Sequence, residues 1–511
     1  KGDVKIEPMT TAAARAAGRP VRLELSREEV FFTVAKHSSQ VFIRTGVTDD
    51  GLIVARRMNV RYNAGAYSVT SPRAAGQGMV RAPGPYHMPN VWVDSTTYFT
   101  NTVPTGPFRG AMTSQVAWAH ESQLDDIAAD LGIDPLELRR RNHLRNDDVY
   151  ATGEKMHDLF YAEILDSVAA GVDWGSPSEP SPPGTARGKG LAIMIKSTYT
   201  PSRSEARLEL VADGSATIWT SSVEMGQGAH ATLAQMGARE LGLAASSVRV
   251  SFTDTDVTPF DTSTASSRTT YSMGNAVRSA ARALKTRLAE LVAEHRGVAE
   301  DAVVVAGGRV VIGDGGDALS YADALALTGR TSLAAEGVFQ STGGLGALDP
   351  ETGQGPATVH WHQGGASAEV EVDLETGVVT VLRMHGAAYA GRMVSPSRVR
   401  QQNEGCAIFA LGPAMLEELL YDDGQMVNPN FSDYMIPSIH DIPRQLTSEG
   451  VEHPDPDTDL HGVGEMVVPA VAPAIGNAIR DAVGTRIRAL PMTPERVLRA
   501  LGEDKRIGGS E

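Results

Sequence analysis

The sequence predicts an α+β (mixed α/β) fold in which hairpin-containing sheets pack against helices. Three stretches alternate apolar and polar residues around a turn that contains glycine, which is the pattern of a β-hairpin. Amphipathic helical patterns lie between these hairpins, and 511 residues are too many for a single core. We therefore expect several sheet-and-helix units, about three by length alone.

The hairpins are expected at residues 41–60, 206–219 and 368–382. Their turn glycines, Gly51, Gly214 and Gly377, are evenly spaced along the chain. Even spacing has two explanations that the sequence does not separate. It is either chance or an internal repeat of related sheet-and-helix units packed side by side.

Three helices have clear sequence signals. Asp134-Pro135 offers an N-cap followed by a proline at the first helical position, and Thr493-Pro494 opens a final helix in the same way. Residues 278–296 place Ala, Leu, Leu and Leu on one face at helical spacing. Residues 171–184 are rich in proline and glycine and predict a linker between two domains.

The composition excludes several kinds of partner. The chain has 46 Lys and Arg against 62 Asp and Glu, a formal charge of −16, and an acidic surface repels the phosphates of nucleic acid. No stretch approaches the ~20 apolar residues of a membrane span, and no secretory signal is visible, so we expect a cytoplasmic protein. The single cysteine, Cys406, excludes an internal disulfide and any iron–sulfur cluster held by this chain alone.

Two loops offer glycine and hydroxyl groups to a ligand. Residues 223–228 (VEMGQG) precede a helix expected near Ala229, and their glycines let the backbone approach an anion. Residues 262–270 are rich in Ser and Thr, whose hydroxyl and backbone donors suit phosphates. Taken singly, each loop has a plainer interpretation, as a tight strand-to-helix turn and as a solvated N-capping loop.

Two further loops carry one charged residue each. Arg109 stands in TGPFRG (105–110), where a rigidly held guanidinium suits an oxyanion or a metal-bound oxo group, although a surface ion pair is the commoner role. Glu465 stands in HGVGEM (461–466), near the expected first turn of an apolar helix. An acid there commonly interacts only with the helix dipole. His360 and His362 share a strand face, but no third ligand stands at a convincing spacing for a metal.

The four loops together resemble one family. PFRG at 107–110, EMGQG at 224–228, the Ser/Thr loop and GVGE at 462–465 occur in its order, followed by NAIRDA at 477–482 and LPMTPE at 490–495. The chain resembles the molybdopterin-binding large subunit of the xanthine dehydrogenase and aldehyde oxidoreductase family, the molybdenum hydroxylases, and the likeness covers nearly all of it. It would lack the N-terminal part, because the family's GGFG loop should come just before Lys1. Residues 1–170 would be the C-terminal part of the first molybdopterin-binding domain, 171–184 a linker and 185–511 the second domain.

The resemblance implies a mechanism and a set of site residues. Glu465 would be the catalytic base in the oxidation of an electron-poor carbon, of an N-heteroaromatic or aldehyde-type substrate, with oxygen derived from water. Gln227 and Arg109 would lie near the molybdenum without binding it directly. The molybdopterin, as a cytosine dinucleotide, would contact Met225, Gly226, Gln227, Gly228, Phe108, Arg109, Gly110, Thr264, Ala265, Ser266, Ser267, Thr269 and Gly464.

Departures from the family concern the substrate. Gln77, Ala111 and Lys196 would line the substrate pocket. Gln77 stands where purine-oxidising members of the family carry an arginine, and Ala111 replaces the phenylalanine that stacks on the substrate ring in those members. Gly2 replaces a glutamate of those members, so xanthine itself is not the expected substrate. Phe409 replaces a frequent glutamine. No cysteine stands near Arg109, which argues against carbon monoxide chemistry.

The resemblance also implies partners and leaves two rival functions. Electrons would pass to [2Fe–2S] clusters and FAD on partner subunits, and a separate chain would carry the missing N-terminal segment if the protein is a split subunit. One rival is a non-catalytic scaffold homologue or incomplete half-site, and the other is a reductive member that acts on an activated aromatic acid. Dye reduction that depends on substrate would favour the oxidative function over both.

Overall fold

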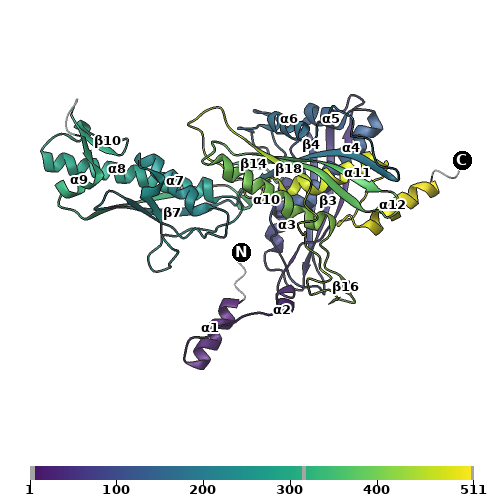
Figure 1. The fold of residues 1–511 in the computed structure, drawn as a ribbon, viewed down its shortest axis with the longest axis horizontal. Coiled ribbons are helices and arrows are strands. Elements are labelled where there is room, and N and C mark those ends of the chain that lie inside the picture. The colour runs from purple at the N-terminus through teal and green to yellow at the C-terminus, as the bar shows by residue number, and fades with distance from the viewer. Residues whose placement is uncertain (1–5, 314–317, 508–511) are drawn as a thin grey trace.

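A computed structural model describes residues 6–313 and 318–507, and Gly2 lies outside them. Figure 1 shows a lobe, drawn in teal, that projects from a larger body. The lobe contains β7 (Ser202–Val211), α7 (Ala229–Leu241), α8 (Gly274–Arg296), β10 (Val303–Ala306) and α9 (Tyr321–Leu327). The body is built from segments that precede and follow this lobe in the chain. Helices and mixed sheets alternate throughout, which confirms the α+β prediction.

All three predicted hairpins form, and each belongs to a unit of the same connectivity. Two antiparallel strands are followed by a helix and then by a strand parallel to the second one. The units are β2 (Ser39–Val47), β3 (Ile53–Gly65), α3 (Ser71–Arg81) and β4 (Asn90–Phe99); β7, β8 (Ala216–Trp219), α7 and β9 (Val248–Val250); and β14 (Trp361–Asp373), β15 (Val379–Tyr389), α10 (Pro396–Met415) and β18 (Gln445–Val451). The turn glycines Gly51, Gly214 and Gly377 all have positive φ. Shared connectivity favours an internal repeat over chance.

Two of the sheets gain a fourth strand. β13 (Ser332–Ser341) pairs with β7 to give the order β13-β7-β8-β9, and β6 (Thr185–Ser197) pairs with β14 to give β18-β15-β14-β6. Helix α11 (Val468–Val483) lies directly on β6 because two strand residues are glycine. A Cβ at Gly188 would lie 2.3 Å from the Ala478 carbonyl oxygen, and one at Gly190 would lie 2.2 Å from that of Ala474.

The predicted helices form where expected. α5 (Pro135–Asn142) begins after Asp134, whose side chain accepts a hydrogen bond from the Glu137 amide at 2.9 Å. α8 buries Ala281, Leu284 and Leu288 on one face. α12 spans Pro494–Ile507. Residues 175–182, within the predicted linker, contain no helix or strand, and the division into two domains there stays a prediction. Side chains from both sides of the linker share one hydrophobic core.

The part of that core between α4 (Thr113–Leu131) and α5 contains a buried polar network centred on Glu121. Its carboxylate accepts hydrogen bonds from Tyr86 Oη (2.5 Å), Arg139 Nε (2.9 Å), the Ile193 amide (3.1 Å) and His120 Nδ1 (3.0 Å). Burial raises the pKa of Glu121, but the Arg139 guanidinium and these donors outweigh it and lower the pKa to about 2. The network joins α4 and α5 to β6, the strand that carries Lys196.

The remaining elements are shorter or lie at the edges of the fold. They are α1 (Ile6–Ala17), α2 (Arg27–Phe31), β1 (Ala35–Lys36), β5 (Thr105–Gly106), α6 (Tyr161–Gly171), β11 (Arg309–Ile312), β12 (Ala318–Ser320), β16 (Tyr421–Asp422) and β17 (Gln425–Met426), with single 3₁₀ turns at 245–247, 300–302 and 345–347 and a π turn at 269–273. Among the helices of residues 6–313 and 318–507, none combines the length and the apolar character that a bilayer crossing requires.

Candidate functional site

A cleft of about 1020 Å³ collects the loops that the sequence singled out. Each of the three units contributes the segment between its second hairpin strand and its helix, or the start of that helix. Arg73 and Gln77 come from α3, Gln227 from the loop before α7 and Arg398 from α10. Loops of this kind lie at the carboxyl ends of strands, where ligands of α/β proteins commonly bind. The three repeated units therefore contribute equivalent segments, each after the second hairpin strand, to one cavity.

Nearly all predicted site residues line this cleft. They are Gln77, Phe108, Arg109, Ala111, Lys196, Met225, Gly226, Gln227, Thr264, Ala265, Ser266, Ser267, Thr269, Gly464 and Glu465. Gly110 and Gly228 do not line it, and both have positive φ, at 73° and 76°. These two glycines turn the chain just before α4 and α7, a conformation that other residues adopt at a cost. Their direct contact with a cofactor stays a prediction.

Glu465 precedes the first residue of α11, Val468, so it lies ahead of the helical turn in which we expected it. Its carboxylate Oε2 lies 2.8 Å from the Lys196 Nζ. The lysine side chain is only 2% exposed and donates a second hydrogen bond to Ser266 Oγ at 3.0 Å. The site therefore holds a carboxylate with its own buried cation at the wall of the cleft.

The loop that carries Glu465 is held by contacts to its backbone. Arg109 Nε donates to the Gly464 carbonyl oxygen at 2.6 Å, and the Cys406 thiol lies 3.5 Å from the same oxygen. Cys406 is fully buried. A Cβ at Gly462 would lie 2.1 Å from the Ser267 carbonyl oxygen, so only glycine permits this approach of the two loops.

The Ser/Thr loop has an unusual backbone. Ser266 and Ser267 both adopt left-handed conformations, with φ of 57° and 56°, which cost free energy for residues other than glycine. Buried Arg268 holds the loop by an ion pair to Asp261 at 2.7 Å and hydrogen bonds to Ser204 Oγ and to the Ser263 carbonyl oxygen. The hydroxyl of Ser267 is buried and has no hydrogen-bond partner in the described part of the chain.

Glu224 organises the glycine loop and was missed by the sequence analysis. Its carboxylate accepts hydrogen bonds from the amides of Gly226 (2.9 Å), Gly228 (3.0 Å) and His230 (3.0 Å) at the start of α7. Partial burial raises the pKa of Glu224, and these amides outweigh it and lower the pKa. An acid just before a helix is the signal that could have identified it. Gln227 donates to the Val223 carbonyl oxygen at 2.8 Å, which fixes its amide within the loop.

Basic residues dominate the charged lining of the cleft. They are Arg73, Arg81, Arg109, Lys196, Arg392 and Arg398, and Glu465 is the one acid among the described lining residues. This balance is the reverse of the whole chain, whose formal charge is −16. Arg398 has a buried Nη1 without a hydrogen-bond partner among residues 6–313 and 318–507. The cleft therefore suits an anionic ligand. Only Arg109 and Lys196 could be predicted from the sequence, because the other four basic residues lie on separate segments without a motif.

Aromatic and polar side chains also line the cleft. The Phe108 ring stacks on Phe409 with centroids 4.7 Å apart, and the Arg109 guanidinium lies 5.6 Å from the Phe409 ring. Buried Arg81 donates to the Ala111 carbonyl oxygen at 2.6 Å and to the Gln77 side chain. Arg81 thus lies one helical turn from Gln77, the position at which the resemblance implies an arginine in purine-oxidising members.

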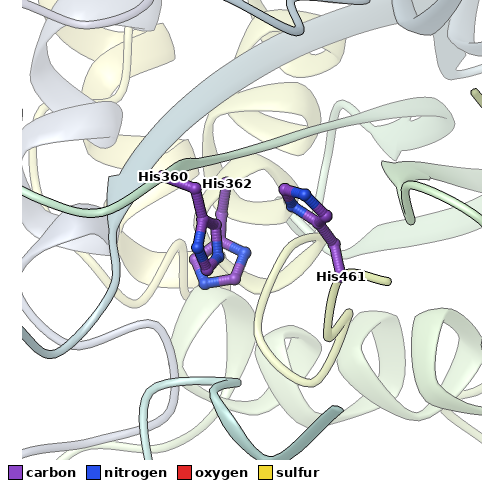
Figure 2. A group of neighbouring side chains, drawn as sticks. All are labelled: His360, His362 and His461. Atoms are coloured by element: carbon purple, nitrogen blue, oxygen red, sulfur yellow. The ribbon is translucent and has the colours of Figure 1, made fainter. Parts of the chain in front are cut away.

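The structure corrects the sequence analysis at the histidines. His461, from the loop before α11, lies beside His360 and His362 and supplies the third histidine that sequence spacing did not reveal (Figure 2). The three come from separate segments of the chain, so no local pattern joins them.

Comparisons with known proteins agree with the four-loop pattern. Two families described as molybdopterin cofactor-binding domains match residues 1–143 and 174–443. The chain is 32% identical over 512 residues to a xanthine dehydrogenase molybdenum-binding subunit of Escherichia coli, covering 97% of this chain and 67% of that protein. It is 28% identical over 527 residues to the 6-hydroxypseudooxynicotine dehydrogenase complex subunit gamma of Paenarthrobacter nicotinovorans, covering 97% and 64%.

A solved structure has the same fold. The aldehyde oxidoreductase from Desulfovibrio gigas superimposes with a TM-score of 0.84 at 28% sequence identity, over 97% of this chain and 53% of that chain. The chain thus spans about two thirds of the Escherichia coli relative and about half of the Desulfovibrio gigas enzyme.

Proposed function

Since this chain belongs to the xanthine dehydrogenase and aldehyde oxidoreductase family of molybdenum hydroxylases, we propose that it forms the molybdopterin-binding site of an oxidoreductase that hydroxylates an electron-poor carbon. The observation that carries the proposal is one cleft lined by all four loops, in which Glu465 is the one carboxylate among the described lining residues and stands among basic side chains. The oxygen comes from water, and the substrate is an N-heteroaromatic compound or an aldehyde.

The residues of the cleft fit a phosphate-bearing pterin. The buried unpaired Nη1 of Arg398 and the unpaired hydroxyl of Ser267 are two donors that an anionic ligand would satisfy. Thr264 to Thr269 and Arg398 would hold the phosphates and the nucleotide, for which we propose cytosine. Gly226 and Gln227 would approach the pterin, and Arg109 would lie beside the molybdenum.

When bound, the molybdenum cofactor supplies two-electron redox chemistry. Glu465 accepts a proton from the water-derived oxygen that attacks the substrate carbon, a contribution of roughly 10²–10⁴-fold for a placed carboxylate. Lys196 orients this carboxylate and compensates its charge. Arg109 donates a hydrogen bond to the Gly464 carbonyl oxygen and so fixes the peptide before Glu465. This contact holds the backbone of the base in one position relative to the cleft.

The side chains near Glu465 favour a substrate other than xanthine. Ala111 leaves space where purine-oxidising members carry an aromatic ring, and Gln77 offers an amide in place of a guanidinium. Relatives of this chain carry different substrate names, among them an aldehyde oxidoreductase and a nicotine 6-hydroxylase large subunit beside the xanthine dehydrogenase subunits. We propose partner subunits that carry [2Fe–2S] clusters and FAD, because the single cysteine cannot hold such a cluster.

Metal and nucleotide analysis of the protein, purified with whatever accompanies it, tests this function. We expect near-stoichiometric molybdenum, cytosine nucleotide released on denaturation, and iron in the associated chains. Dye reduction with a panel of N-heterocycles and aldehydes then identifies the substrate. Absence of molybdenum and nucleotide, in cells that make the cofactor, would contradict the proposal and favour the non-catalytic scaffold. Bound cofactor without any oxidative dye reduction would favour the reductive alternative.

A further inference from the structure

A cluster of three histidines lies beside the cleft, where β14 meets the loop that carries Glu465. His362 belongs to β14 and His360 directly precedes Trp361, its first residue, while His461 comes from the opposite loop (Figure 2). One ring nitrogen of each residue lies within 4.8 Å of those of the other two. We propose that His360, His362 and His461 bind a Zn²⁺ ion that fastens the Glu465 loop to β14.

Unpaired nitrogens are the first argument for a cation. Both ring nitrogens of His360 and Nδ1 of His461 are buried without a hydrogen-bond partner among the described residues, and the His362 ring has a backbone contact with Ser266 alone. His362 and His461 are buried, with 1% and 8% exposed, and His360 is half-buried. Buried polar atoms are rarely left unpaired, because burial removes their hydrogen bonds to water and an unpaired atom gains none in return. A metal ion would use one lone pair from each ring.

Ring packing explains the proximity but not the unpaired nitrogens. His360 and His461 lie 4.6 Å apart between ring centroids, and Tyr271 lies 4.3 Å from the His360 ring. An aromatic cluster alone would form equally well from phenylalanines, which leave no polar atom buried. Three imidazoles at one point are therefore costly unless they share a ligand.

The choice of metal follows from the ligands and their spacing. Three imidazole nitrogens with one position left for water or another ligand is a common arrangement for Zn²⁺, with Zn–N distances of about 2.0–2.1 Å. Nitrogens within 4.8 Å of one another would each move by about 1 Å or less to reach such an ion. Of the three histidines, His461 lines the cleft.

Zinc binding to the purified full chain tests this inference. The protein is dialysed against chelator, then titrated with Zn²⁺, and bound zinc is measured by mass spectrometry. We expect one tight site per chain, with X-ray absorption at the zinc edge showing three imidazole ligands. H362Q and H461Q should each weaken binding by at least about 100-fold, since even altered supporting residues cost up to that factor. H295Q, at the exposed end of α8, is the matched control and should bind as the unaltered chain does.

Two results would overturn the site. One is wild-type protein that takes up no zinc and whose thermal midpoint does not rise with added Zn²⁺, since binding to the folded state must stabilise it. The other is zinc that binds equally well to H362Q and H461Q, or that is coordinated by oxygen alone. The wild-type measurement stands even if a variant fails to fold. Since neither readout uses molybdenum or turnover, failure here leaves the proposed hydroxylase function untouched.

Discussion

The Nζ of Lys196 lies 2.8 Å from Oε2 of Glu465, although the two residues come from distant parts of the chain. Lys196 stands near the end of β6, and Glu465 stands in the loop before α11, the helix that packs on β6 through Gly188 and Gly190. The close approach of α11 and β6 therefore sets the position of the ion pair. Removal of the Glu465 carboxylate would take away the negative charge that faces the nearly buried Lys196 ammonium.

The first prediction concerns the base. E465Q should lower turnover by at least roughly 100-fold, because an amide cannot accept the proton, whereas molybdenum and nucleotide should stay bound. Turnover and metal content are measured on the same preparation. E290Q, on the exposed surface of α8, is the control and should retain full turnover. Unchanged turnover in E465Q would exclude Glu465 as the base.

The second prediction treats Lys196 and Glu465 as one unit. K196M should lower turnover because the carboxylate loses the cation that orients it. The double variant K196M/E465Q should then be no slower than E465Q alone, since residues that act together are not additive. K155M, which breaks an exposed ion pair with Asp147, should leave turnover unchanged. If instead the two effects multiply in the double variant, Lys196 acts independently of Glu465.

The sequence predicted what is local in the chain. Hairpin alternation, the Asp134 N-cap and the four loops all depend on neighbouring residues, and each appears where expected. Contacts between distant segments could not be predicted. The Lys196–Glu465 pair depends on how α11 lies on β6, and the position of His461 beside His362 depends on how a loop crosses the end of β14.

The third prediction tests the close approach of the two loops. G462A should place a Cβ 2.1 Å from the Ser267 carbonyl oxygen, so the Glu465 loop or the Ser/Thr loop must move. A displacement of about 1 Å can cost about 100-fold in rate, so we expect turnover to fall by that order and bound nucleotide to decrease. G405A is the control, because nothing lies within 4 Å of a Cβ added there. Full cofactor content and turnover in G462A would show that this contact does not shape the site.

The last prediction concerns Glu121, whose network supports the strand that carries Lys196. E121Q should lower stability by about 3–5 kcal/mol near neutral pH, since it leaves buried Arg139 without one of its two acidic partners. The folded pKa of Glu121, about 2, lies below its ordinary value of 4.5, so its contribution is complete above about pH 4.5 and is lost as pH falls towards 2. The gap in thermal midpoint between wild type and E121Q should therefore narrow through this window. E137Q, which removes the exposed partner of Arg141, should differ little from wild type at any pH. A gap for E121Q that stays constant as the pH falls would show that Glu121 is not held as a charged group, because only an ionised carboxylate loses its advantage on protonation.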